Sequence, residues 1–240
     1  MMKINILAIT AHPDDVELSA AGTLISHKDR GYTTGVIDLT RGEMGTRGSA
    51  DQRLKEASDA AEIMGLSVRE NMGFADGFFI NDQAHQLSLI QKIRKFQPDI
   101  VLTNALYDRH PDHGRGAQLV EEASFKSGLK KIETMDDEGN PQQAWRPKKI
   151  YFAVQSTSVA PTFFVDISSA QEKKMQAIRA YKTQFFDPKS KEPETYIARP
   201  EFLEMIESRA REYGHRIGVK YAEGFVSKEF SGVKDLYHLI

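Results

Sequence analysis

The sequence predicts an α/β fold, in which a mostly parallel sheet is flanked by helices, and three observations indicate it. Apolar runs of strand length alternate with longer segments whose apolar residues recur at helical spacing. A glycine follows three of the helical segments, at Gly31, Gly65 and Gly128. The alternation also continues through most of the chain. Strands and helices in this order indicate parallel strands joined by right-handed crossovers.

The first half of the chain shows the alternation most clearly. Residues 3–10 read as an apolar strand, and residues 16–30 carry apolar side chains at helical spacing. The later segments are predicted as strands over 32–39, 66–68 and 99–103 and as helices over 51–64, 87–96 and 112–127. This order favours a Rossmann-like sheet, with an active site at the carboxyl ends of the first and fourth strands.

The second half extends the same sheet. Its predicted elements are strands over 149–155 and 162–167 and helices over about 170–183 and 200–213. The polar, proline-bearing stretches 134–147 and 186–195 are typical of exposed loops and not of domain linkers. A chain of 240 residues lies within what one α/β domain occupies. We therefore expect a single domain over 1–240.

Composition and charge exclude several classes of protein. The 32 basic and 34 acidic residues give a net charge of -2, which would not attract nucleic acid. No stretch approaches the roughly 20 apolar residues that cross a bilayer, and the N-terminal apolar run is too short for a signal peptide. We therefore expect a cytoplasmic protein without a membrane partner. Because there is no cysteine, a metal would have to be held by His, Asp or Glu.

Two polar clusters follow the first and fourth predicted strands. A-H-P-D-D occupies residues 11–15, and D-R-H-P-D-H occupies residues 108–113. Taken alone, Asp14 and Asp15 would be interpreted as capping residues of the next helix. The second cluster weakens that interpretation, because loops after neighbouring strands of a doubly wound sheet face each other across the switch point. We therefore expect one site built from both loops.

The residue types in these clusters suit a hydrolytic metal site. His12, Asp15 and His113 would supply two imidazoles and one carboxylate and leave a fourth position for water, as in zinc hydrolases. The same donors fit Fe²⁺ and other divalent metals. Asp14, adjacent to a ligand but not bound itself, is the candidate general base.

His110 and Asp112 complete the predicted catalytic set. A protonated His110 can stabilise an oxyanion or protonate a departing amine, with Asp112 holding its ring. A solvated loop histidine is an equal interpretation of His110.

Three other functions fit the sequence less well. The loop after the first strand lacks G-x-G-x-x-G, which argues against a nucleotide-binding protein. A non-catalytic metal-binding module has no need of an unligated carboxylate at Asp14. A two-metal phosphoesterase needs bridging carboxylates that the two clusters do not obviously supply.

The two motifs together resemble the signature pair of the LmbE-like deacetylases related to PIG-L. The resemblance extends through L-T-R-G-E-M-G-T-R-G at 39–48, F-A-D-G at 74–77 and Y-A-E-G-F at 221–225. It implies zinc-dependent hydrolysis of the N-acetyl group of a small N-acetylglucosamine conjugate. The chain looks most similar to BshB-type enzymes of bacillithiol biosynthesis, which act on N-acetylglucosaminyl malate. Inositol and chitobiose conjugates are the alternative substrates.

The resemblance implies the same roles for the three metal ligands, for Asp14 as the base and for His110. It also implies which residues contact the substrate. The residues that it implies as sugar contacts are Arg53 and Asp76, joined by Glu43 or Arg47. Tyr196 corresponds to a tyrosine that polarises the acetyl carbonyl, and Arg109 is either a clamp for a substrate carboxylate or a partner of Asp108. Related enzymes assemble as trimers or hexamers, so a homo-oligomer is expected.

Overall fold

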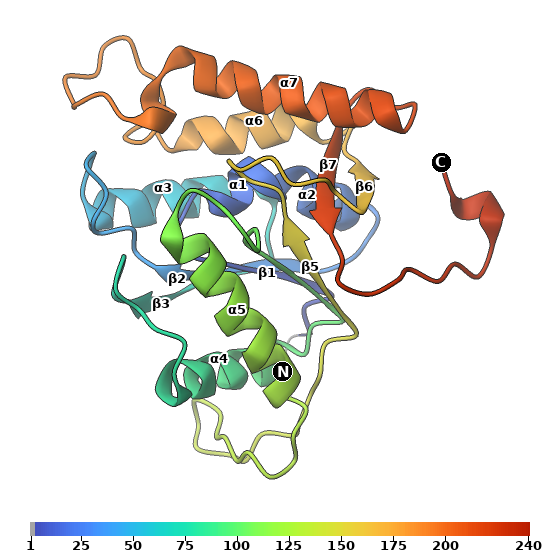
Figure 1. The fold of residues 1–240 in the computed structure, drawn as a ribbon. Helices are drawn as coiled ribbons and strands as arrows, with labels where there is room; N and C mark the ends of the chain where they lie inside the picture. The colour runs from blue at the N-terminus through green and yellow to red at the C-terminus, as the bar shows by residue number, and fades with distance from the viewer. Residues whose placement is uncertain (1–2) are drawn as a thin grey trace.

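The computed structural model describes residues 3–240, and within them seven strands form one sheet in the order β3-β2-β1-β4-β5-β7-β6 (Figure 1). The strands are β1 (Ile6–Thr10), β2 (Thr34–Thr40), β3 (Val68–Phe74), β4 (Ile100–Thr103), β5 (Lys149–Ala153), β6 (Phe163–Asp166) and β7 (Ala222–Val226). The pairs from β3 to β5 are parallel, whereas β7 is antiparallel to both β5 and β6. The predicted α/β class with a mostly parallel sheet is confirmed.

Helices cover both faces of the sheet. They are α1 (Asp15–Ser19), α2 (Ala21–Asp29), α3 (Ala50–Met64), α4 (Gln83–Phe96), α5 (Pro111–Lys126), α6 (Gln171–Ala180) and α7 (Pro200–Arg216), with 3-10 turns η1 (Tyr196–Ala198) and η2 (Leu236–His238). Helices α4 and α5 lie on one face, and the other helices lie on the opposite face, with α6 and α7 outermost (Figure 1). None of the helices within 3–240 has the length and apolar character needed to span a bilayer.

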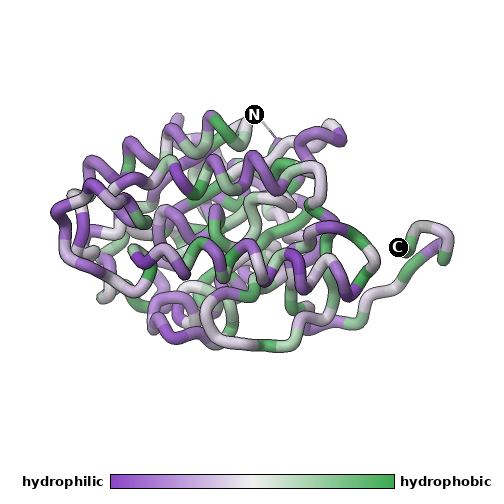
Figure 2. The backbone as a smooth tube through the Cα atoms, turned by 90° about the horizontal axis from the view of Figure 1, so that it is seen from above, coloured by the Kyte–Doolittle hydropathy of each residue, from purple (hydrophilic) through white to green (hydrophobic). Residues whose placement is uncertain are grey.

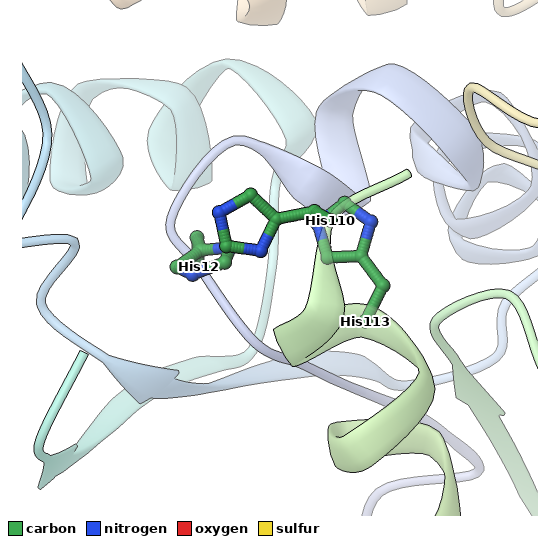
Figure 3. A group of neighbouring side chains, drawn as sticks. All are labelled: His12, His110 and His113. Atoms are coloured by element: carbon green, nitrogen blue, oxygen red, sulfur yellow. The ribbon is translucent and has the colours of Figure 1, made fainter. Parts of the chain in front are cut away.

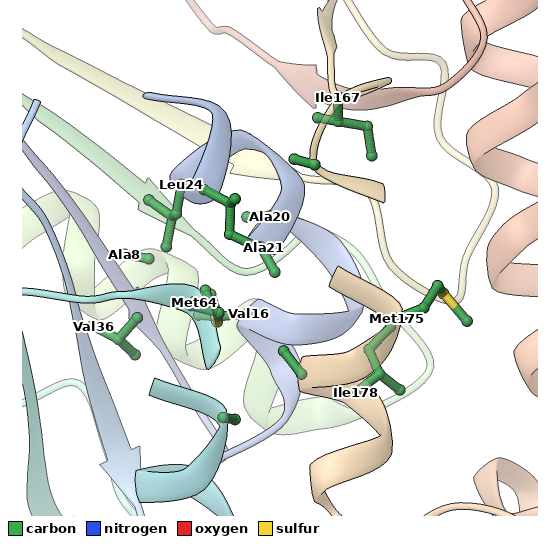
Figure 4. Packing of buried hydrophobic residues seen from close by; sticks show 14 of the residues in the cluster. Ala8, Val16, Ala20, Ala21, Leu24, Val36, Met64, Ile167, Met175 and Ile178 are labelled. Atoms are coloured by element: carbon green, nitrogen blue, oxygen red, sulfur yellow. The ribbon is translucent and has the colours of Figure 1, made fainter. Parts of the chain in front are cut away.

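Alternate residues of β1 enter two separate cores. Ile6 and Ala8 pack with α1, α2, α3 and α6 in the larger cluster, part of which Figure 4 shows. Leu7 and Ile9 face the second cluster, which is formed with α4 and α5. This is the period of two expected of a strand that is buried on both sides. The hydropathy colours of Figure 2 agree, since green segments run through the interior and purple predominates on the outer helices.

The order of the strands places the site. β1 pairs with β2 on one side and with β4 on the other. The strands that follow β1 are therefore added on one side of it first, and from β4 onwards on its other side. Loops that leave the carboxyl ends of two such strands diverge to opposite faces and leave a crevice between them. The predicted neighbourhood of the first and fourth strands is therefore confirmed.

The structure differs most from the predicted elements at three places. The helix expected over 16–30 is interrupted at Ala20, which separates α1 from α2. Strand β3 runs to Phe74 and is much longer than the predicted 66–68. Strand β7 was not predicted, because its five residues include a central glycine and no alternation of polar and apolar side chains.

A buried carboxylate explains why a new helix starts after Ala20. Glu223 on β7 accepts hydrogen bonds from the amides of Gly22 and Thr23, at 3.0 and 2.7 Å, and therefore caps the free amides of α2. Its remaining charge is paired with Lys174 of α6 at 2.7 Å, and both side chains are only 3% exposed. The partner of α2 thus comes from about 200 residues further along the chain, which no local sequence pattern could predict.

We expect Glu223→Ala to lower the free energy of unfolding by about 3–5 kcal/mol, because it leaves the Lys174 ammonium buried without a partner. Urea unfolding followed by circular dichroism measures this loss. The control is Glu212→Ala, which removes an exposed partner of Arg216 and should change stability by no more than about 0.5 kcal/mol. Equal losses in the two variants would contradict the assignment of Glu223 as the anchor of α2.

Candidate active site

The loop after β1 and the start of α5 meet at the carboxyl ends of β1 and β4. His12 follows β1, and His110 and His113 lie at the beginning of α5 (Figure 3). One ring nitrogen of each histidine lies within 4.8 Å of the others. The three side chains border a cavity of about 330 Å³, whose wall also includes Asp14 and Asp15. The two sequence clusters therefore form a single site.

The Asp15 carboxylate lies between two of these imidazoles. Its Oδ2 is 3.5 Å from His12 Nδ1, and its Oδ1 is 3.0 Å from His113 Nε2. The side-chain amides of Asn104 and Gln155 each donate a hydrogen bond to Asp15 at 3.0 Å, one to each oxygen. These donors hold the carboxylate in one orientation, in which it faces both rings.

Each of the two histidines also has an aspartate behind it. His12 Nε2 lies 2.9 Å from Asp76 Oδ1 and 3.4 Å from Asp112 Oδ2. His113 Nδ1 lies 2.5 Å from Asp108 Oδ2. Burial alone would raise the pKa of Asp108, but hydrogen bonding to His113 lowers it to about 2. Carboxylates in this position fix the tautomer and the ring orientation of metal-binding histidines.

Two groups of the described residues have donor atoms close enough to share a metal ion: His12 with His110 and His113, and His12 with Asp76 and Asp112. The predicted set of His12, Asp15 and His113 shares two histidines with the first group, and the Asp15 carboxylate lies against both of these rings. Two imidazole nitrogens and one carboxylate oxygen are donors that hydrolytic zinc and iron sites use. That set therefore stays a prediction.

Asp14 lies beside these donors, and its carboxylate is free. The side chain is buried and lines the cavity, and within residues 3–240 no group donates a hydrogen bond to it. Burial raises the pKa of the Asp14 carboxyl to about 7, while the positive charge of Arg53 acts in the opposite direction. A carboxyl with such a pKa can accept a proton from water near neutral pH.

His110 lines the cavity, and its Nδ1 is used as a hydrogen-bond acceptor. It is the N-cap of α5, and its Nδ1 accepts a hydrogen bond from the backbone amide of Asp112 at 3.3 Å. Burial, together with His12 and His113, lowers the pKa of His110. The neutral ring that accepts at Nδ1 carries its proton on Nε2, from which it can stabilise a developing oxyanion.

The predicted support of the His110 ring by the Asp112 carboxylate is wrong. That carboxylate is fully buried, does not line the cavity, and accepts hydrogen bonds from the Gly77 amide at 2.8 Å and from Arg115 at 2.9 Å. Asp112 stands in the first turn of α5, where its side chain turns towards the loop after β3. It therefore contacts that loop and His12.

The loop after β2 provides one wall of the cavity and corrects a second prediction. Glu43 does not line the cavity, because its carboxylate accepts hydrogen bonds from the amides of Asp76 and Arg41, at 3.0 and 3.2 Å. It joins the loop after β2 to the loop after β3. Asp76 does line the cavity, but both of its oxygens already have partners, in His12 and the Met44 amide.

Four arginines also line the cavity, namely Arg47, Arg53, Arg109 and Arg209. Arg53 from α3 lies against Gly42 and Gly45 and donates to Gln184, while Arg109 stacks over the Tyr196 ring with its guanidinium carbon 4.2 Å from the ring centre. Both residues of this stack reach the cavity. Arg109 therefore pairs with the ring of Tyr196.

Several residues of the site were not predicted. Asn104 and Gln155 hold Asp15, Asp108 backs His113, and Arg209 of α7 lines the cavity. Asn104 and Gln155 lie just after the ends of β4 and β5, so their position beyond a strand end was the available signal. Arg209 comes from a helix remote in sequence and gave no such signal.

A cluster of histidines and aspartates that could hold a metal ion lies at the switch point of a Rossmann-like sheet, and this arrangement is typical of metal-dependent hydrolases. Comparison with known families agrees. The model of the family PIG-L, described as GlcNAc-PI de-N-acetylase, matches residues 7–124. The chain belongs to this PIG-L family, which is also called LmbE-like, and it is a hydrolase of the deacetylase type that acts on a linear amide.

Individual relatives are similar to this chain over half of its length or more. The conserved protein TT1542 from Thermus thermophilus has a similar structure, with a TM-score of 0.84 and 34% identity, covering 96% of this chain and 98% of that one. The diacetylchitobiose deacetylase of Thermococcus kodakarensis is 29% identical and covers 98% of this chain and 88% of its own length. A probable N-acetyl-alpha-D-glucosaminyl L-malate deacetylase 2 of Bacillus anthracis is 31% identical over 50% of this chain and 58% of the relative.

Proposed function

We propose that the protein hydrolyses the N-acetyl group of a small N-acetylglucosamine conjugate, with Zn²⁺ held by His12, Asp15 and His113. Asp14 is the general base, and His110 is the donor to the oxyanion. The observation that carries the proposal is the free Asp14 carboxylate beside a set of metal-binding side chains, inside a cavity large enough for a sugar. A site that only stored metal would have no need of this carboxylate.

The chemistry assigns one task to each group. The bound metal ion supplies Lewis acidity, which lowers the pKa of water and polarises a carbonyl. Asp14 accepts a proton from the attacking water at a carboxylate oxygen, and the water oxygen adds to the acetyl carbon. His110 donates its Nε2 hydrogen bond to the oxygen that becomes negative. When the carbon-nitrogen bond breaks, a proton passes to the amine, and acetate and the free amine leave.

We further propose N-acetylglucosaminyl malate as the substrate, in bacillithiol biosynthesis. Two arginines on the cavity wall, Arg47 and Arg109, form no ion pair within residues 3–240, and Arg47 Nε is buried there without a hydrogen-bond partner. A guanidinium is the side chain best suited to bind a carboxylate through two hydrogen bonds. The two carboxylates of a malate group would provide such partners, whereas chitobiose is neutral.

A substrate panel tests this proposal. Zinc-loaded protein is incubated with the N-acetylglucosamine conjugates of malate, inositol and a second N-acetylglucosamine, and released acetate is measured. We expect kcat/KM for the malate conjugate to exceed that for the neutral conjugates by about tenfold or more. Arg109→Gln should remove most of that preference. A preference for the chitobiose conjugate would contradict the malate conjugate as the substrate. If no conjugate released acetate, the proposed deacetylase role would be contradicted.

Metal identity, assembly and location are part of the same proposal. We propose zinc as the native metal, one domain over 1–240, a trimer or hexamer, and a cytoplasmic location. Elemental analysis of protein purified from cells measures the metal, and light scattering after size exclusion measures the mass. A monomer in solution would contradict the proposed assembly. Protein that carries iron in place of zinc would contradict the proposed metal.

A further inference from the structure

The backbone of Asp14 has a conformation that residues with a side chain rarely adopt. Its φ is 105° and its ψ is -24°, and within residues 3–240 Gln97 is the only other non-glycine residue with a positive φ. Such strain persists only where the surrounding structure holds it. Asp14 begins α1, but no side chain caps the helix there. Hydrogen bonds between His12 and Asp15 hold the loop on either side of it, and contacts further along α1 add to them.

Glu17 provides a buried contact of this kind. Its side chain is fully buried, and its Oε1 lies 2.5 Å from Nη1 of Arg69 on β3. The other two nitrogens of Arg69 donate to the two oxygens of Asp38 on β2, at 2.8 and 2.9 Å. Exposure of the three side chains is 8% or less. One guanidinium thus ties α1 to two strands of the sheet.

We propose that Glu17, Arg69 and Asp38 form a clamp that holds Asp14 in its strained conformation, with the carboxylate in the cavity. The clamp acts through the backbone of α1, because Glu17 lies three residues after Asp14 and the Leu18 amide donates to the Asp14 carbonyl at 3.0 Å. None of the three clamp residues lines the cavity, so they are positioning residues. The inference rests on the proposed role of Asp14 as the base.

The clamp also contacts α3, which carries Arg53 to the cavity wall. Nη1 of Arg69 donates to the carbonyl of Ala57 on α3 at 3.2 Å. Arg53, which lines the cavity together with Asp14, lies one turn earlier on the same helix. A single planar guanidinium therefore sets the positions of α1 and α3 together. Lysine, with one charged nitrogen, could not make the same set of contacts.

The variant Glu17→Gln tests the clamp while it leaves the paired contact between Arg69 and Asp38 in place. We expect kcat for acetate release to fall by roughly 10- to 100-fold, because the base moves relative to the substrate. KM should stay within about twofold, and the metal content should be unchanged. A crystal structure of the variant should show Asp14 outside the left-handed region. Arg69→Lys should give a smaller loss of kcat than Arg69→Gln.

A control separates positioning from general stability. Arg94 is 1% exposed and donates to the carbonyls of Ser127, Leu129 and Ile132, outside the cavity. Arg94→Lys should lower the melting temperature and leave kcat within about twofold. Equal losses of kcat in the Arg94 and Glu17 variants would overturn the proposal.

The backbone of Asp14 gives a readout that needs no substrate. Retention of a φ near 105° in folded Glu17→Gln overturns the clamp, and Arg69→Lys supplies the same readout if Glu17→Gln does not fold. Failure of the unaltered protein to release acetate would instead contradict only the proposed function. The two failures are therefore distinguishable.

Discussion

Replacing Asp14 by asparagine is expected to lower kcat for acetate release by about 10²–10⁴-fold, because the amide cannot take a proton from water. Asparagine has nearly the same shape and tolerates the left-handed conformation better than most residues, so α1 should form as before. The metal content should also be unchanged, because Asp14 is not one of the proposed ligands. Steady-state kinetics and elemental analysis of the same preparation test both parts.

The control for this prediction examines the alternative in which Asp14 only begins a helix. Asp82 is the N-cap of α4, its side chain accepts a hydrogen bond from the His85 amide at 2.9 Å, and it lies outside the cavity. Asp82→Asn should leave kcat within about twofold. If Asp14→Asn were equally active, Asp14 would be reduced to a structural residue, and the case for a catalytic site over a metal-binding module would lose its main support.

The sequence was sufficient to predict where the site lies. Parallel strands place their following loops at one edge of the sheet, so the two clusters after β1 and β4 needed only those strands to be neighbours. The residues that face the cavity from these loops, such as Asp14 and His110, could therefore be predicted as a group. The residue types also predict a chemistry for the site, because histidine and carboxylate together suit a divalent metal.

The supporting residues could not be predicted, because their partners are set by tertiary contacts. Asp112 precedes His113 directly, and its place in the sequence predicts a contact with His110, but its position in the first turn of α5 turns the carboxylate towards Gly77 and His12. Glu43 looked like a sugar contact, yet it bonds to backbone amides of two loops. In both cases the sequence shows the type of the residue but not the direction of its side chain.

The break between α1 and α2 has the same origin. Apolar spacing is continuous across Ala20, so a single helix was the natural expectation. The amides that start α2 are capped by Glu223, which reaches them only because β7 inserts between β5 and β6. Long-range pairing of this kind overrides local periodicity.

Replacing Asp108 by alanine is expected to weaken metal binding by about 10- to 100-fold, because His113 would lose the carboxylate that fixes its tautomer. The contact between His113 Nδ1 and Asp108 Oδ2 is 2.5 Å, and the Asp108 side chain is fully buried. Without it, Nδ1 and Nε2 compete for the proton, and a fraction of the rings presents the protonated nitrogen to the metal. Competition with a chelator of known affinity measures the change in the dissociation constant.

The pair Asp82 and His85 is the control for this prediction, because it lies outside the proposed metal site. Asp82 lies 2.7 Å from His85 Nδ1, in a contact of the same kind between residues that do not line the cavity. Asp82→Asn should leave the affinity for metal unchanged. Excess zinc should restore much of the activity of Asp108→Ala but none of the activity of Asp14→Asn, since only the first variant is limited by metal occupancy. If excess zinc did not restore the activity of Asp108→Ala, Asp108 would not act by orienting His113 for metal binding.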